Sequence, residues 1–218
     1  LKVAACTNPT CTAATLSTLD TTGDVGQYTS ITIGADANPI ISYYDNSNSD
    51  LKVAACTNPT CTAATVSTLD TTGNVGQYTS ITIGADANPI ISYFDASNSD
   101  LKVAACTNPT CTAATVSTVD TTGNVGYYTS ITIGADANPI ISYYDNNNSA
   151  LKVAACTNPT CTAATLSTVD TTGTVGYYTS ITIGADAHPI ISYYDNSNRD
   201  LKVAKLTRTS WTPNTWES

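Results

Sequence analysis

The chain has 218 residues, which is enough for one or two domains, and its 17 acidic and 8 basic residues give a net charge of −9. The few lysines and arginines are scattered in this acidic background, which excludes nucleic acid as a partner, because phosphates require clustered positive charge. All of the acidic residues except Glu217 are aspartate, and Thr, Val, Ile and Tyr are abundant, a composition that favours strands and turns over helices.

A segment of about 50 residues repeats along the chain. LKVAACTNPTCTAAT begins at residues 1, 51, 101 and 151, and an altered copy, LKVAKLTRTSWTPNT, begins at residue 201. A fixed period of about 20–50 residues indicates a solenoid, a propeller or an array of separate units. The near identity of the copies indicates recent amplification or deliberate design.

Four short strands are expected in each period, taken here from residues 25–74. Runs of β-branched and aromatic residues alternate with turn-forming clusters of Gly, Asn, Asp and Pro, which places the strands at residues 28–33, 40–44, 51–55 and 64–69. Four strands at roughly 10-residue spacing with no helix predict an all-β fold, and the long period favours a β-propeller of four-stranded antiparallel blades. A β-solenoid and a string of separate sandwich repeats are the alternatives.

The segment SITIGADANPIISYYDNSNSDLKVAAC resembles the core of a WD40-like propeller blade. It has an inner strand, a turn, a second strand of small residues, an acidic turn and a third strand, in that order. The Trp-Asp pair of WD40 repeats is absent, so the resemblance implies the propeller fold without membership of that family. The chain also resembles highly repetitive bacterial propellers and symmetric designed ones.

Blade boundaries follow from the repeat. We expect a partial blade, an outer hairpin, at 1–24, and blades at 25–74, 75–124, 125–174 and 175–218. The first-and-second-strand hairpin then occurs four times and the third-and-fourth-strand hairpin five times, so one outer hairpin lacks an inner partner. We therefore expect that the chain does not close as a simple monomeric ring. The two terminal hairpins could compete for one inner hairpin, residues 1–20 could exchange with another copy to give a homo-oligomer, or the parent protein could be longer.

Eight cysteines form four C-x4-C pairs between the third and fourth strands. In the fifth copy Leu206 and Trp211 replace both cysteines together, as expected if an apolar cross-strand pair has replaced a bridge. We therefore expect disulfides within blades; free buried thiols and zinc are the alternatives, although zinc wants four ligands and each pair supplies two. The predicted bridges join Cys6 to Cys11, Cys56 to Cys61, Cys106 to Cys111, and Cys156 to Cys161.

Disulfides imply an oxidising compartment, and hence a secreted or cell-surface protein. No apolar run reaches 18 residues, so no membrane span is expected. Nothing in the sequence calls for a cofactor or a metal.

No catalytic set can be assembled from these residues. His188 is the one histidine and stands at a turn position that Asn occupies in the other copies, and Arg199 and Arg208 are one arginine short of the triad that sialidase-like propellers use. Asp45 and Asp50 recur as a pair in other copies, but near-identical blades give them near-identical environments, whereas a glycosidase needs one protonated and one ionised carboxyl. We expect these aspartates to hydrogen-bond turn amides, with calcium or sugar binding as the alternative.

Two loops are expected to share one face of the propeller: the connection from the fourth strand to the next first strand, and the turn between the second and third strands. We call this surface the ligand face. Its mixture of aromatic, amide and carboxylate side chains suits sugar hydroxyls. The candidate residues are Tyr28, Tyr44, Asp45, Asn46, Tyr78, Phe94, Asp95, Tyr127, Tyr144, Asp145, Tyr177, Tyr194 and Asp195.

The sequence thus predicts a non-enzymatic, secreted repeat scaffold or binding module, with a lectin-like role and a glycan ligand as its sharper form. A purely structural or designed symmetric propeller with no ligand is the alternative, and a carboxylate-based glycosidase a remote one. Period-2 alternation also predicts that Ile31, Ile33, Ile40 and Val53, with their equivalents, form the core between blades.

Overall fold

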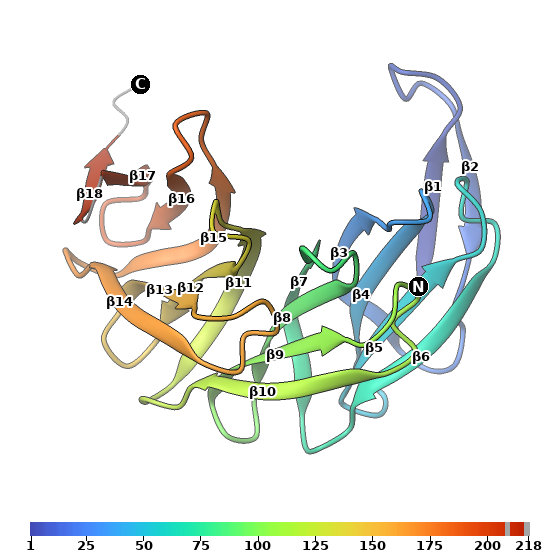
Figure 1. Ribbon diagram of the computed structural model, residues 1–218, viewed down its shortest axis with the longest axis horizontal. Coiled ribbons are helices and arrows are strands. Elements are labelled where there is room, and N and C mark those ends of the chain that lie inside the picture. Colours follow the sequence, from blue (N-terminus) through green and yellow to red (C-terminus); the bar gives the residue numbers. More distant parts are fainter. Residues whose placement is uncertain (208–209, 216–218) are drawn as a thin grey trace.

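The computed structural model describes residues 1–207 and 210–215, and all the regular structure in them is β-strand (Figure 1). The first two strands, β1 (Lys2–Cys6) and β2 (Ala14–Thr18), form a two-stranded sheet that we call the N-terminal half-blade. Blade 1 consists of β3 (Val25–Ile33), β4 (Pro39–Asp45), β5 (Asp50–Cys56) and β6 (Ala64–Asp70).

The same four-stranded antiparallel sheet then recurs three times. Blade 2 consists of β7 (Val75–Ile83), β8 (Pro89–Asp95), β9 (Asp100–Cys106) and β10 (Ala114–Asp120). Blade 3 consists of β11 (Val125–Ile133), β12 (Pro139–Asp145), β13 (Ala150–Cys156) and β14 (Ala164–Asp170). Blade 4 consists of β15 (Val175–Ile183), β16 (Pro189–Asp195), β17 (Asp200–Thr207) and β18 (Ser210–Thr215).

The blades stand side by side in an open arc, with the N-terminal half-blade at one end and blade 4 at the other (Figure 1). The first strand of each blade, β3, β7, β11 or β15, packs against the first strand of its neighbours and so lies nearest the axis of the arc. The predicted all-β propeller with an extra outer hairpin is confirmed, and in the described residues the sheets do not close into a ring.

Apolar side chains from consecutive blades meet in a shared core. Ile40 and Val53 of blade 1 are 2% and 0% exposed, as the sequence predicted, and they pack with Ile81 of blade 2, which is 6% exposed. The prediction is wrong for Ile31 and Ile33, which are 57% and 58% exposed. In later blades the equivalents of Ile31 are 6–7% exposed and those of Ile33 are partly buried, because strands of the preceding blade lie against them. In the described residues the N-terminal half-blade consists of β1 and β2 alone, and these leave Ile31 and Ile33 open.

A buried polar cluster ties each blade to the one before it. At the junction of blades 1 and 2, Asp70 accepts hydrogen bonds from the Tyr93 hydroxyl at 2.7 Å and from Lys102 Nζ at 2.6 Å. Burial by itself would raise the pKa of Asp70, but the bonds from Lys102 and Tyr93 outweigh it and hold that pKa below its usual value. The cluster recurs at the other junctions with Asp20, Asp120 and Asp170 as acceptors.

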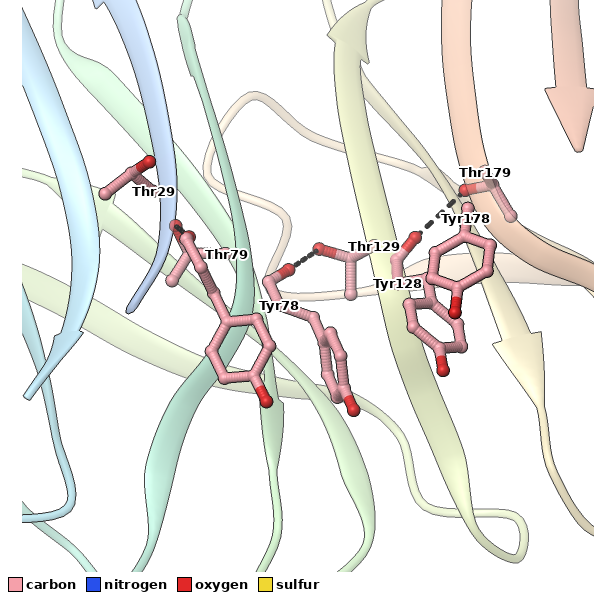
Figure 2. Close-up of a pocket in the computed structure, with 8 residues that line it drawn as sticks. Thr29, Tyr78, Thr79, Tyr128, Thr129, Tyr178 and Thr179 are labelled. Atoms are coloured by element: carbon pink, nitrogen blue, oxygen red, sulfur yellow. Dashed lines mark hydrogen bonds between the residues drawn. The ribbon is translucent and has the colours of Figure 1, made fainter. Parts of the chain in front are cut away.

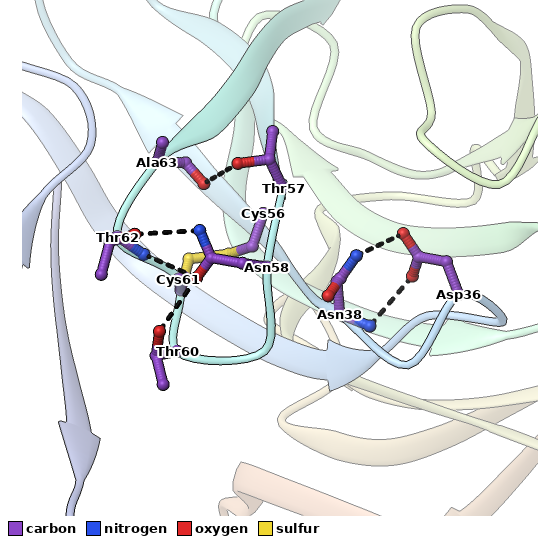
Figure 3. The surroundings of a disulfide bond; sticks show 9 residues. All are labelled: Asp36, Asn38, Cys56, Thr57, Asn58, Thr60, Cys61, Thr62 and Ala63. Carbon is purple, nitrogen blue, oxygen red and sulfur yellow. Dashed lines mark hydrogen bonds between the residues drawn. A yellow bond between two sulfur atoms is a disulfide. The ribbon is translucent and has the colours of Figure 1, made fainter.

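The four predicted disulfides are confirmed, with Cα–Cα distances of 4.9–5.0 Å. Figure 3 shows the bridge between Cys56 and Cys61, around which Asn58 organises the loop. The Asn58 side-chain nitrogen Nδ2 donates to Thr62 Oγ1 at 2.9 Å, and Asn58 Oδ1 accepts from the Thr60 hydroxyl at 3.0 Å. In the four outer hairpins that carry cysteines, the loop at the end is thus closed both covalently and by local hydrogen bonds.

Candidate ligand face

The two loops predicted to form the ligand face do lie together. The Asn46 amide in the β4–β5 turn donates to the Asp24 carbonyl at 2.9 Å, and the Asp24 amide donates to the Ser47 hydroxyl at 2.7 Å. The Val75 amide, which follows the next connection, donates to the Ser49 carbonyl at 2.9 Å. The turn between the second and third strands therefore contacts a connection on each side of it.

Asp45 and its equivalents hold the turns, as the sequence predicted for them. Asp45 is 1% exposed, and its Oδ1 accepts from the Ser47 and Asn48 amides at 3.1 Å each while Oδ2 accepts from the Asn48 side chain at 2.9 Å. Asp95, Asp145 and Asp195 are equally buried. These carboxylates lie beneath the turns and present no open side to a ligand. Burial and the nearby Asp45 raise the pKa of Asp50 above its usual value.

The aromatic residues at the ends of the second strands join blades. Phe94 and Tyr144 are each 3% exposed and stack on the next blade, with ring centroids 4.1 Å from Tyr127 and 4.3 Å from Tyr177. Tyr44 instead donates its hydroxyl to Asn74 Oδ1 at 2.8 Å. Tyr194 ends the second strand of blade 4, and no blade follows it within the described residues.

One junction leaves a polar atom unpaired. Asn74 Oδ1 accepts from Tyr44 and, at 3.2 Å, from Gln77. At the next junction Phe94 and Tyr127 stand at those two positions, and within the described residues Asn124 Oδ1 is buried and accepts no hydrogen bond. Neighbouring junctions with the same backbone therefore differ in chemistry.

The open aromatic surface of the molecule lies at its axis. Tyr28, Tyr78, Tyr128 and Tyr178, which we call the tyrosine row, stand on the first strands of blades 1 to 4 and line a pocket of about 280 Å³ (Figure 2). Successive ring centroids are 4.6, 4.7 and 4.5 Å apart. The two end members are the most open, with Tyr28 41% and Tyr178 66% exposed.

A backbone irregularity turns these tyrosines to the axis. Each has a positive φ of 52–54°, in the left-handed region that bulky residues rarely adopt. The strand register shifts at the same place, between Gln27 and Ser30 in blade 1, as in a β-bulge. Strained backbone of this kind persists where the surrounding structure requires it, and it is often found at functional sites.

Three of the four threonines that share the pocket, Thr79, Thr129 and Thr179, donate to a carbonyl of the preceding blade. Thr129 donates to the Tyr78 carbonyl at 2.9 Å and Thr179 donates to the Tyr128 carbonyl at 3.1 Å, as the dashed lines in Figure 2 show. The phenol rings and hydroxyls, with Thr29 at one end, are thus the groups that line the space. Burial and a neighbouring tyrosine raise the pKa of Tyr128 to about 12, so its hydroxyl stays neutral at physiological pH.

The sequence identified only part of this row. It selected Tyr28 and Tyr78, but in the last two copies it selected Tyr127 and Tyr177, one position earlier, which lie between blades instead. The signal that could have found Tyr128 and Tyr178 is that this position is Tyr in all four copies, whereas the preceding one varies between Gln and Tyr.

The remaining candidates lie elsewhere. His188 sits in the exposed β15–β16 turn with Nδ1 2.8 Å from the Asp186 carbonyl oxygen, as predicted for a turn residue. The Asn46 side chain donates to Asp24 Oδ2 at 2.8 Å on the open surface. Among residues 1–207 and 210–215 no group of three or more His, Cys, Asp or Glu residues could hold a metal ion. In the same residues, no helix has the length and apolar character to cross a membrane.

No protein-family model matches the chain, and no curated protein matches it. Solved structures do resemble it. A protein of unknown function from Dyadobacter fermentans gives a TM-score of 0.62 at 11% identity, over 87% of this chain and 52% of that one. An exo-β-1,3-galactanase from Phanerochaete chrysosporium gives 0.57 at 12% identity, over 88% of this chain and 50% of that one.

An α-L-arabinofuranosidase from Lactobacillus brevis gives a TM-score of 0.56 at 11% identity, over 86% of this chain and 72% of that one. The chain spans about half the length of the first two structures. At this identity the likeness shows the fold alone, which is that of β-propeller proteins.

Proposed function

We propose that the chain is a non-enzymatic binding module that takes a neutral glycan along the tyrosine row. The observation that carries the proposal is the make-up of the axial pocket, whose lining among the described residues is tyrosine and threonine alone. Aromatic faces stack on the C–H faces of sugar rings, while phenol hydroxyls supply hydrogen bonds at their edges. The four rings form one continuous surface, which suits a ligand longer than a single sugar.

The charge distribution supports a neutral ligand. The lining carries no group that is ionised at physiological pH, and the net charge of −9 disfavours anions. The proposal of a module without hydrolase activity is supported by the burial of Asp45 and its equivalents beneath their turns, where they are bound to amides. Two of the structural neighbours are named as enzymes that act on carbohydrates, an analogy of fold and not of site.

We also propose that the module works outside the cell, as a secreted or cell-surface protein. Four disulfides in a chain of this size support an oxidising compartment, because thiols are kept reduced in the cytosol.

A glycan array probed with the oxidised chain tests the proposal, followed by titration of each hit. Tyr178→Ala and Tyr28→Ala remove the two most exposed rings and should each weaken binding roughly two- to tenfold, the range expected for one aromatic contact of about 0.5–1.5 kcal/mol. Leu166→Ala, on the outer strand β14 and 38% exposed, is the control and should bind as the parent does.

If the chain bound no glycan on the array, or if the Tyr28→Ala/Tyr178→Ala double variant bound as the parent does, the proposed glycan site would be overturned. A structural propeller without a ligand would then be the remaining interpretation. Hydrolysis of a bound glycan that is lost in Asp45→Asn would overturn the non-enzymatic part.

A further inference from the structure

In the part of the chain that the structure describes, the N-terminal half-blade has an open strand edge. In blades 1 to 4 the third strand pairs with the second strand on one edge and the fourth on the other, so that in blade 1 Ile40 lies opposite Ala55. β1 is the third strand of the N-terminal half-blade, and within the described residues it pairs only with β2. Its other edge therefore offers unpaired backbone groups, which proteins usually cover.

An apolar groove lies beside this edge. It has a volume of about 190 Å³, and Leu1, Val3, Ala4, Thr29, Ile31 and Ile41 contribute to its walls. Ile31 is 57% exposed here, whereas Ile81, Ile131 and Ile181 at the same repeat position are 6–7% exposed. The groove is thus the place that a first-and-second-strand hairpin fills at every later junction.

Within the described part of the chain, Lys2 lacks the ion pairs that the lysines at the same repeat position form. Its equivalents Lys52, Lys102, Lys152 and Lys202 are buried and each pairs with an aspartate of the preceding blade and one of its own blade. Lys2 is exposed, and no aspartate in the described residues pairs with it. A cover for the groove that also brought carboxylates to Lys2 would complete the repeated arrangement.

We propose that a second copy of this chain covers the groove with its β15–β16 hairpin, and that β1–β2 replaces β17–β18 as the outer hairpin of that copy's blade 4. The hairpin carries the PIISYYD sequence that pairs with the third strand in blade 1. Lys2 would then take the position of Lys202 and meet Asp170 and Asp195 of the second copy. The contact repeats the interface between blades that the chain already forms.

Blade 4 is the blade that can exchange its outer hairpin. In β17 and β18 the register places Leu206 opposite Trp211, where the other copies have the two bridged cysteines. Leu201, at the start of β17, is 58% exposed, while Leu51, Leu101 and Leu151 are 0% exposed. Exchange replaces this hairpin by a disulfide-closed one and buries Ile31 of the incoming copy. Because the interface joins unlike surfaces, it gives a ring or a growing chain of copies.

Molar mass in solution, measured by light scattering over a range of concentrations, tests the association. Multiples of 22.6 kDa that grow with concentration are expected. Ile31→Asp, which changes a side chain exposed in the single copy, should return the chain to a monomer. Leu16→Asp is the matched control, because Leu16 is 76% exposed on β2 of the same half-blade but lies outside the groove. A monomer at every concentration, or equal effects of the two variants, would overturn the proposal.

Cysteine cross-linking tests which hairpin is bound. Ala5→Cys and Ile190→Cys chains are mixed and oxidised, with the native bridges checked by peptide mapping. The register Ile40 to Ala55 predicts a disulfide between the two chains. Ile140→Cys is the matched control at the same position of blade 3 and should not link. A bond within single chains of the Ala5→Cys/Ile190→Cys double variant would show that the chain closes on itself, and equal linking of the control would show random contact. Either result would refute the exchange.

Discussion

The clearest test of what holds the blades together is Asp120→Asn, at the junction of blades 2 and 3. Asp120 Oδ2 accepts from the Tyr143 hydroxyl at 2.7 Å and from Lys152 Nζ at 2.5 Å. The Asp120 and Lys152 side chains are 0% and 9% exposed. The substitution keeps the shape and an acceptor for Tyr143 but removes the charge that compensates Lys152.

The cost can be worked from the remaining contacts. Removing one partner of a buried ion pair costs about 3–5 kcal/mol, because the other charge is left uncompensated. Asp145 Oδ2 lies 3.9 Å from Lys152 Nζ and still compensates part of it, so the expected loss is at the lower end, about 3 kcal/mol. Adding Lys152→Met removes the stranded charge, and the double variant should recover about 2 kcal/mol of that loss.

Equilibrium urea unfolding of the oxidised chain, followed by near-ultraviolet circular dichroism, measures these differences. Asp136→Asn is the control: this exposed aspartate of the β11–β12 turn contacts Asn138, and asparagine keeps its turn-forming acceptor. A loss at Asp120→Asn no greater than that of the control would refute the reasoning. So would a double variant less stable than the single one, because the stranded lysine could not then be the cause.

At a concentration where the chain is monomeric, Ile81→Ala should cost about 2–5 kcal/mol in unfolding free energy. Ile31→Ala at the same repeat position, 57% exposed in the single copy, should then cost under about 1 kcal/mol, and equal losses would contradict this difference in burial. Reduction of the four disulfides should add the mass of eight hydrogens to the intact chain, and each bridge lost should lower the free energy of unfolding by about 2 kcal/mol. Labelling of eight free thiols in the unreduced, unfolded chain would contradict this prediction. Burial and the Asp70 carboxylate raise the pKa of Tyr93 above its usual value of about 10. The stability that this phenol contributes is therefore complete below about pH 10 and is lost as the pH rises further. Full phenolate absorbance of the still-folded chain would contradict this. The lowered pKa of Asp70 acts oppositely: its contribution is complete above about pH 4 and disappears as pH falls below it, which acid titration of the urea midpoint measures.

Much of the fold was predictable because its signals are local. The 50-residue period, the strand and turn segments and the C-x4-C pairs are visible within one repeat. Residues five apart across a turn meet whatever the rest of the molecule does, which is why the bridge between Cys56 and Cys61 could be predicted. The same holds for Asp45, whose partners are two and three residues away.

The junctions between blades were not predictable in this way. Lys102 stands between apolar residues of a third strand, and the sequence contains no sign that it pairs with Asp70, 32 positions earlier. Which pairs meet is decided by how one sheet lies on the next, and near-identical repeats offer several equivalent aspartates.

The repeat unit, its strands, its turns and its disulfides follow from the amino-acid sequence alone, because interactions between residues close together along the chain determine them. Which tyrosines form the axial row depends on the three-dimensional fold, because a bulge that shifts the register moves Tyr128 to the axis and leaves Tyr127 between blades. The fold also makes Ile31 open and Ile81 buried, although their local sequences are the same. Burial depends on whether a preceding sheet is present to exclude water, and the sequence of a single repeat carries no information about that neighbouring sheet.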